Sequence, residues 1–130
     1  MDTVIIDTDI LINHARGKTQ RLSELILQQK AKELVLIIPS IVIFEFYSGA
    51  SLASADIFSM ADLLFSQFKI QELNEEIAKV GAQLNRTLKL YEKIDTADII
   101  IGATCIFLSA KLCTGNKRHF LLIPQINFLQ

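Results

Sequence analysis

The chain alternates short apolar runs with longer segments of helical period. Each run is rich in Val, Ile and Leu and is bounded by turn-forming residues, which is typical of strands buried on both faces of a parallel sheet. The predicted strands are residues 3–6, 34–38, 68–73 and 111–114, and residues 121–124 are a candidate for a short last strand.

Helical segments separate these strands, because apolar residues recur in them three and four positions apart. The predicted helices are residues 23–32, 40–49, 53–67, 74–91 and 95–110. The second and the last of these are apolar on almost every side and are predicted to be buried, and Ser40 is the expected N-cap of the second. This alternation predicts an α/β fold with three layers, α/β/α, around a central sheet of four to five parallel strands.

Composition adds limits to this picture. The 130 residues fit one domain, residues 1–130. Half of the residues are apolar and mean hydropathy is +0.37, so an oligomer or a bound partner is expected to cover apolar surface. The longest apolar stretches, 34–44 and 99–110, are too short to span a membrane, and the acidic start is unlike a secretory signal. A cytoplasmic protein is therefore expected.

Neither the two thiols nor the net charge points to a chemistry. Cys105 and Cys113 stand among apolar residues, without a partner at zinc-ligand spacing, and are predicted to be small buried hydrophobes. The net charge of −1 is not that of a basic nucleic-acid-binding domain. The cations do cluster, however, although scattered solvated charges would explain them equally well. The two clusters are Arg16, Lys18 and Arg21, and Lys111, Lys117, Arg118 and His119.

Three acids stand where acids are costly. Glu45 is the only charged residue between positions 34 and 49, and an unpaired buried carboxylate costs several kcal/mol unless it becomes neutral. Asp98 opens an apolar helix, where it could also belong to a capping box with Asp95. Asp7 ends the first strand, at the sheet edge where ligands of open parallel sheets bind. For Glu45, an edge position or an ion pair is the structural alternative.

Three carboxylates gathered at one rim would require a cation between them. Each pair would repel by about 4 kcal/mol at a separation near 4 Å. Oxygen ligands without His or thiolate select Mg²⁺ or Mn²⁺. Such an ion activates water and stabilises charge on a phosphate, so the predicted chemistry is hydrolysis of a nucleic-acid phosphodiester. Without these three acids, 13 basic residues face 11 acidic ones, a balance of +2.

Four segments, in order, resemble the PIN-domain ribonucleases and, among them, the VapC-type toxins of toxin–antitoxin pairs. The strand and helix start at residues 4–12 resemble the first motif, with Asp7 as its acid. Ser40 followed by Glu45 resembles the second, and the segment opening with Asp98 resembles the third. Residues 114–120 resemble the fourth. The resemblance covers nearly the whole chain.

This resemblance implies a PIN-like fold, Mg²⁺-dependent (or Mn²⁺-dependent) endoribonuclease activity, a homodimer, and an antitoxin whose tail occupies the acidic groove. The residues that it implies for the metal and catalysis are Asp7, Glu45 and Asp98, supported by Thr8, Thr114 and Asn116. The candidates for contacting RNA phosphate are Arg16, Lys117, Arg118 and His119. Many relatives have an additional Asp in the fourth motif, where this chain has Asn116 and His119, so one metal is expected more readily than two.

Two further acids and one apolar segment leave alternatives open. Asp9 is expected to cap the first short helix rather than to hold metal-bound water, and Asp95 is expected to be an N-cap. Residues 51–68 are richer in apolar side chains than a one-sided helix needs, which fits either core packing or a dimer or antitoxin surface. The chain could also be an RNA-processing nuclease without an antitoxin, or a non-catalytic α/β binding module.

Overall fold

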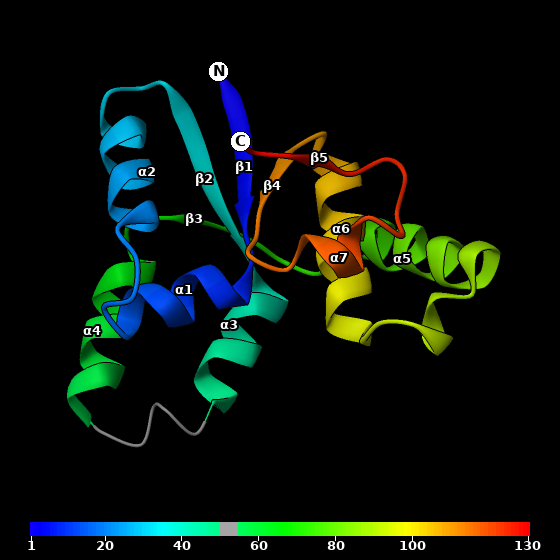
Figure 1. Cartoon of the computed structure of the whole chain (residues 1–130), viewed down its shortest axis with the longest axis horizontal. Coiled ribbons are helices and arrows are strands. Elements are labelled where there is room, and N and C mark those ends of the chain that lie inside the picture. The colour runs from blue at the N-terminus through cyan, green and yellow to red at the C-terminus, as the bar shows by residue number, and fades with distance from the viewer. Residues whose placement is uncertain (50–54) are drawn as a thin grey trace.

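The fold is described from a computed structural model, for residues 1–49 and 55–130. Within these residues, five parallel strands form one sheet, in the order β3-β2-β1-β4-β5 (Figure 1). The strands are β1 (Asp2–Ile6), β2 (Leu34–Pro39), β3 (Lys69–Gln71), β4 (Lys111–Cys113) and β5 (Asn127–Phe128). The predicted α/β class and parallel sheet are confirmed.

Helices flank the sheet and supply the crossover connections that parallel strands need. They are α1 (Thr8–Ala15), α2 (Arg21–Lys30), α3 (Ser40–Ser48), α4 (Ala55–Phe65), α5 (Glu75–Leu88), the short 3-10 helix η2 (Leu90–Glu92), α6 (Thr96–Leu108) and α7 (Lys117–Phe120). In Figure 1, α1, α2 and α4 lie on one side of β1, while α5 and α6 lie on the other. The carboxyl ends of β1 and β2 point to the same edge, from which α1 and α3 depart.

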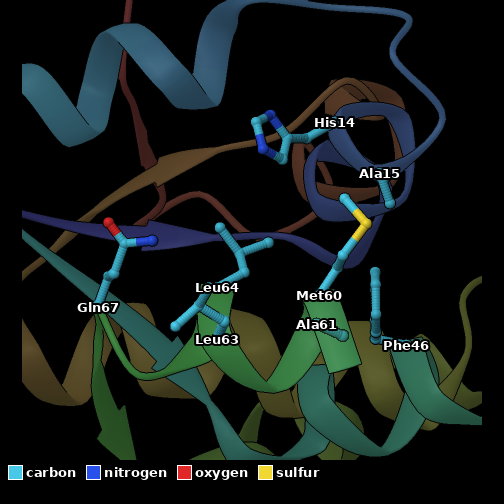
Figure 2. Close-up of a pocket in the computed structure, with 8 residues that line it drawn as sticks. All are labelled: His14, Ala15, Phe46, Met60, Ala61, Leu63, Leu64 and Gln67. Carbon is cyan, nitrogen blue, oxygen red and sulfur yellow. The ribbon is translucent and has the colours of Figure 1, made fainter. Parts of the chain in front are cut away.

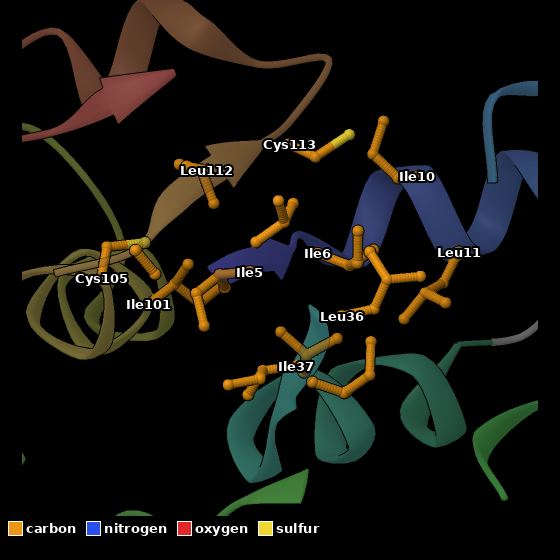
Figure 3. Close-up of a cluster of buried hydrophobic side chains, with 14 of the residues drawn as sticks. Ile5, Ile6, Ile10, Leu11, Leu36, Ile37, Ile101, Cys105, Leu112 and Cys113 are labelled. Carbon is orange, nitrogen blue, oxygen red and sulfur yellow. The ribbon is translucent and has the colours of Figure 1, made fainter. Parts of the chain in front are cut away.

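Strand β1 is the centre of the core. Its last three residues, Val4, Ile5 and Ile6, are fully buried. Ile5 pairs with Ile37 of β2 on one side and with Leu112 of β4 on the other. Figure 3 shows these strand residues meeting side chains of α6 and α1. Since each fully buried Ile contributes about 1.5–3 kcal/mol, the end of β1 is firmly held.

The two cysteines belong to this core. Cys105 of α6 and Cys113 of β4 are both buried free thiols, and both appear in the cluster of Figure 3. Burial raises the pKa of the Cys105 thiol to about 12. The prediction of small buried hydrophobes is confirmed.

The expected strand at residues 121–124 was wrong. These residues continue the turn that follows α7, where the Ile123 N–H donates to the Phe120 carbonyl at 3.0 Å. The last strand is β5, which begins at Asn127, three residues after the predicted strand ends. Pro124 has no N–H for a strand ladder, so the apolar run around it packs as a turn instead.

Helix α3 departs from its prediction in two ways. It is not buried on every side: Val42 and Phe46 are buried, whereas the Phe44 side chain is 67% exposed. The N-cap position belongs to Pro39, and the Ser40 hydroxyl instead accepts a hydrogen bond from the Leu73 N–H at 3.2 Å. The apolar face of α3 therefore partly meets solvent.

The remaining predicted helices exist with shifted ends. The helix expected at 74–91 ends earlier, because Lys89 adopts a left-handed conformation with φ 52° and starts η2. The start of the helix expected at 53–67 lies outside the described residues, as do residues 51–54 of the segment 51–68. Among the described helices, none is long and apolar enough to cross a membrane.

Candidate active site

Asp7 is held where β1 and β4 end side by side. The Ile6–Cys113 pairing puts Asp7 and Thr114, the next residue of each strand, at the same rim. Asp7 is only 5% exposed, and its Oδ1 accepts a hydrogen bond from the Thr8 N–H at 2.7 Å. The Thr114 hydroxyl donates to Asp7 Oδ2, also at 2.7 Å. Asp7 therefore caps α1 and is clamped from β4.

Glu45 reaches the same rim from α3. The Thr8 hydroxyl donates a 2.7 Å hydrogen bond to Glu45 Oε1. Thr8 is itself 8% exposed, since it opens α1 directly behind the buried strand. Its backbone N–H binds Asp7 while its side chain binds Glu45, so one residue joins two of the predicted acids.

Asp98 comes from the first turn of α6, as predicted. Its side chain is 15% exposed, and its Oδ2 lies 3.0 Å from Nδ1 of His119 on α7. The same imidazole nitrogen lies 3.0 Å from the Asn116 side-chain amide. Asp95 takes the N-cap position of α6 but forms no side-chain capping bond among the described residues.

The pKa values show that these acids sense one another. Burial raises the pKa of Asp7 to about 7, against the lowering effect of the Thr114 hydrogen bond, and the charges of Asp9 and Asp98 raise it further. Burial also raises the pKa of Glu45, and the charge of Asp98 adds to this effect. The predicted acids Asp7, Glu45 and Asp98 are therefore brought to one rim with an excess of negative charge.

Asp9 has a different position from the one predicted. The cap of α1 is Asp7, whereas Asp9 Oδ2 accepts a 2.9 Å hydrogen bond from the Gly115 N–H. Its Oδ1 is buried without a hydrogen-bond partner among the described residues. A Cβ on Gly115 would lie 2.6 Å from Asp9 Oδ2, so only glycine permits this approach. Asp9 is thus a further acid of the rim, and its place two residues after Asp7 was the available signal.

This donor set fits a hard divalent cation. It offers carboxylate oxygens, an unpartnered buried oxygen on Asp9, and acids whose pKa values are raised by burial and mutual repulsion. Within the described residues, no group of three or more Asp, Glu, His or Cys side chains is arranged so that it could hold a metal ion by itself. Mg²⁺ does not require such a group, because it keeps several waters and takes few carboxylates together with substrate phosphate oxygens.

The predicted cations divide into two groups. Lys111 forms an ion pair with Asp2 at 2.9 Å, and the Arg21 guanidinium donates to the Gln130 carbonyl, so both cations have partners within the fold. Lys117 lies 5.6 Å from the centre of the Phe128 ring but remains exposed. The other exposed cations are Arg16, Lys18 and Arg118. His119 is half-buried beside Asp98 and Asn116 rather than a lone surface residue.

Comparison with known proteins gives this arrangement a family. Residues 4–124 match the PIN domain. The chain belongs to the PIN-domain family. Ribonuclease VapC19 of Mycobacterium tuberculosis is 33% identical over 129 residues, which cover 94% of this PIN-domain chain and 95% of that protein. Ribonuclease VapC10 of the same organism is 28% identical over 124 residues, covering 95% and 90%.

Solved structures agree with the PIN-like fold. VapBC2 from Rickettsia felis, bound to a DNA fragment from its promoter, superposes with a TM-score of 0.84 at 23% identity, covering 98% of this chain and 97% of that one. DNA-bound VapBC from Salmonella typhimurium gives a TM-score of 0.85 at 20% identity, covering 99% and 98%. These two neighbours show the fold, and the VapC relatives place the chain among the PIN-domain ribonucleases.

Proposed function

We propose that this PIN-domain protein is an Mg²⁺- or Mn²⁺-dependent endoribonuclease that acts as the toxin of a toxin–antitoxin pair. The observation that carries the proposal is the placement of Asp7, Glu45 and Asp98 at the carboxyl edge of the sheet, where burial raises the pKa of Asp7 and Glu45 and the charge of Asp98 adds to the effect. The similarity to the VapC ribonucleases supports the same conclusion.

Asp7, Glu45 and Asp98 would hold the metal. When bound, a divalent ion lowers the pKa of water and offsets the charge that builds on a phosphate during in-line displacement. The chain's own residues prepare this site: Thr114 fixes one oxygen of Asp7, and Thr8 orients Glu45. Because these hydroxyls donate to the carboxylates, they hold the ionised forms in place before substrate arrives.

RNA would approach across exposed cations, two of which directly follow the loop at this edge. Lys117 and Arg118 lie on α7, directly after the loop that carries Thr114, and Arg16 follows the end of α1. Their charges offer phosphate contacts without selecting a base sequence. His119 is less suited to this role through Nδ1, since that atom already faces Asp98 and Asn116.

An antitoxin is the partner that we propose for the apolar surface of α4. Met60 is 66% exposed and Leu63 is 71% exposed. They border a cavity of about 240 Å³ between α1, α3 and α4, shown in Figure 2, whose other lining residues are His14, Ala15, Phe46, Ala61, Leu64 and Gln67. The apolar face of an antitoxin helix would fit this surface.

We also propose that the protein forms a homodimer, and we assign no surface to that contact.

Purified protein and a mixed RNA pool test the activity. Cleavage should occur with Mg²⁺ and stop when a chelator is added. Asp7→Asn should abolish cleavage and relieve growth arrest, while its circular dichroism stays that of the folded protein. Undiminished cleavage by Asp7→Asn would refute the proposed site. Wild-type protein that binds neither Mg²⁺ nor Mn²⁺ in the millimolar range would favour the non-catalytic binding module.

The antitoxin separates the toxin from a processing nuclease. If the protein is a toxin, a short antitoxin-sized reading frame should lie just upstream of its own, and co-expression of that product should restore growth. RNA cleavage without any such neighbour would favour the RNA-processing alternative.

A further inference from the structure

His119 and Asn116 form a bridge between two acids that come from different elements. The Thr114 hydroxyl donates to Asp7 Oδ2 and accepts a hydrogen bond from the Asn116 N–H at 2.9 Å. The Asn116 side-chain nitrogen Nδ2 lies 3.0 Å from His119 Nδ1, which lies 3.0 Å from Asp98 Oδ2. A continuous series of polar contacts therefore runs from the end of β1 to the first turn of α6.

The chemistry of these groups decides where the hydrogen on His119 lies. An ionised carboxylate only accepts hydrogen bonds, so Nδ1 must carry a hydrogen toward Asp98. An amide N–H₂ facing that same nitrogen would then set two donors against each other. Turning the Asn116 amide over, so that its oxygen and not Nδ2 faces the imidazole, removes this conflict, and the single Nδ1–H is then shared between the Asn116 oxygen and Asp98 Oδ2.

Packing explains why His119 reaches Asp98. The next residue, Phe120, is fully buried, and Ile123 is 1% exposed. A Cβ on Gly102 would lie 2.6 Å from Ile123 Cδ1, so the turn after α7 lies directly against α6 one turn beyond Asp98. The buried residues Phe120 and Ile123 therefore fix the backbone of His119 against α6, so its imidazole is not free to move as a surface side chain would be.

We propose that His119 is a positioning residue that orients Asp98 through Nδ1–H, with Asn116 holding the imidazole in that orientation. The inference deepens the proposed function and rests on it, since Asp98 is one of the proposed metal-holding acids. In this chain, the fourth-motif positions Asn116 and His119 then contribute no carboxylate of their own. They serve the acid of the third motif instead.

Two substitutions isolate the Nδ1–H group. The side-chain amide nitrogen of His119→Asn can occupy the place of Nδ1, whereas His119→Leu keeps bulk and removes the donor. In calorimetric titration of the full chain with Mn²⁺ and no RNA, His119→Leu should bind about 10–100-fold more weakly than wild type. His119→Asn should recover most of that loss. Leu121→Ala, a change of a 68% exposed side chain beside α7, should bind like wild type.

Kinetics and spectroscopy give independent readouts. With RNA, His119→Leu should lower kcat and leave KM within about twofold, because an orienting group acts on the acid and not on RNA affinity. The ¹⁵N shifts of the His119 ring should report the Nδ1–H tautomer when the ring is neutral. If His119→Leu does not fold, as judged by circular dichroism, His119→Ala takes its place, and the tautomer remains measurable in wild type.

Several results would overturn the positioning role. Wild-type Mn²⁺ affinity in His119→Leu would do so, as would an Nε2–H tautomer. A raised KM for RNA with unchanged Mn²⁺ affinity would make His119 a phosphate contact instead. If wild type binds Mn²⁺ and His119→Leu binds it weakly, but neither cleaves RNA, the proposed function fails while the positioning role stands. Absence of Mn²⁺ binding in wild type would contradict both.

Discussion

The hydroxyl of Thr8 donates a 2.7 Å hydrogen bond to Glu45 Oε1 across 37 residues of chain. Thr8 is buried at the start of α1, and its backbone N–H also binds Asp7. Thr8 therefore positions Glu45 through its hydroxyl and also donates the N–H that the N-cap Asp7 accepts. A threonine next to an acid has here a role that an apolar residue of equal shape could not take.

Thr8→Val should separate these two roles. Valine keeps the shape and the backbone N–H, but Glu45 loses its donor, which should lower kcat about 10–100-fold and stability by about 1–3 kcal/mol. Thr8→Ser keeps the hydroxyl and should retain most activity. Steady-state RNA cleavage and urea denaturation measure the two effects. Equal activity of the valine and serine variants would contradict the orienting role.

Asp7 should make the metal-free protein less stable as pH rises. Its pKa is 3.8 ordinarily and about 7 in the folded protein. The stabilisation from a raised pKa is complete below the unfolded value and is lost as pH rises through the folded value, here from about pH 4 to about pH 7. The loss is on the order of 4 kcal/mol at most.

Asp7→Asn provides the test, because an amide cannot ionise. In chelator, the variant should match wild type near pH 4 and exceed its free energy of unfolding near pH 7.5. Urea denaturation at both pH values measures the difference. A stability difference between the two proteins that does not change with pH would show that Asp7 does not carry this effect.

Gly115→Ala should destabilise the rim through Asp9. The new Cβ would lie 2.6 Å from Asp9 Oδ2, so Asp9 must move and its hydrogen bond from the Gly115 N–H is strained or lost. We expect a loss of about 1–3 kcal/mol in the free energy of unfolding. In an Asp9→Ala background the same change should cost clearly less, since the clash is absent. Additive losses in this double-mutant cycle would contradict the contact.

Leu63→Lys should weaken antitoxin binding without changing RNA cleavage. Leu63 is 71% exposed and borders the pocket of Figure 2, so a lysine there would put a charge on the proposed apolar interface. We expect at least a tenfold rise in Kd, measured by calorimetry with the cognate antitoxin. Leu27→Lys, on α2 and 65% exposed, is the matched control and should bind normally. Normal binding by Leu63→Lys together with a loss of self-association would assign this surface to the dimer.

Much of the fold could be predicted from local pattern. Runs such as residues 34–38 must be buried on both faces, and burial of a lone charge is costly, so Glu45 and Asp98 stood out against their apolar surroundings. Asp7 stood out because a strand end in a parallel sheet is where ligands bind. These inferences needed only the order of residues within one segment.

Other features were decided by contacts between distant segments. The partner of Asp9 is Gly115, 106 residues away, and the partner of Asp98 is His119, 21 residues away. The place of Asp9 just after a strand end suggested a cap, and the apolar composition of residues 40–49 suggested a helix buried on every side. Both predictions were wrong, because a local pattern does not show which segments become neighbours.

Local residue patterns are enough to predict that buried parallel strands alternate with helices and that a few acids lie where water cannot easily solvate them. How those acids are held depends on contacts between distant segments. The β3-β2-β1-β4-β5 order brings the ends of β1 and β4 together, and with them Asp7 and Thr114. Hydrogen bonds act over about 3 Å, so they exist only once the packing of the sheet has brought their partners within reach.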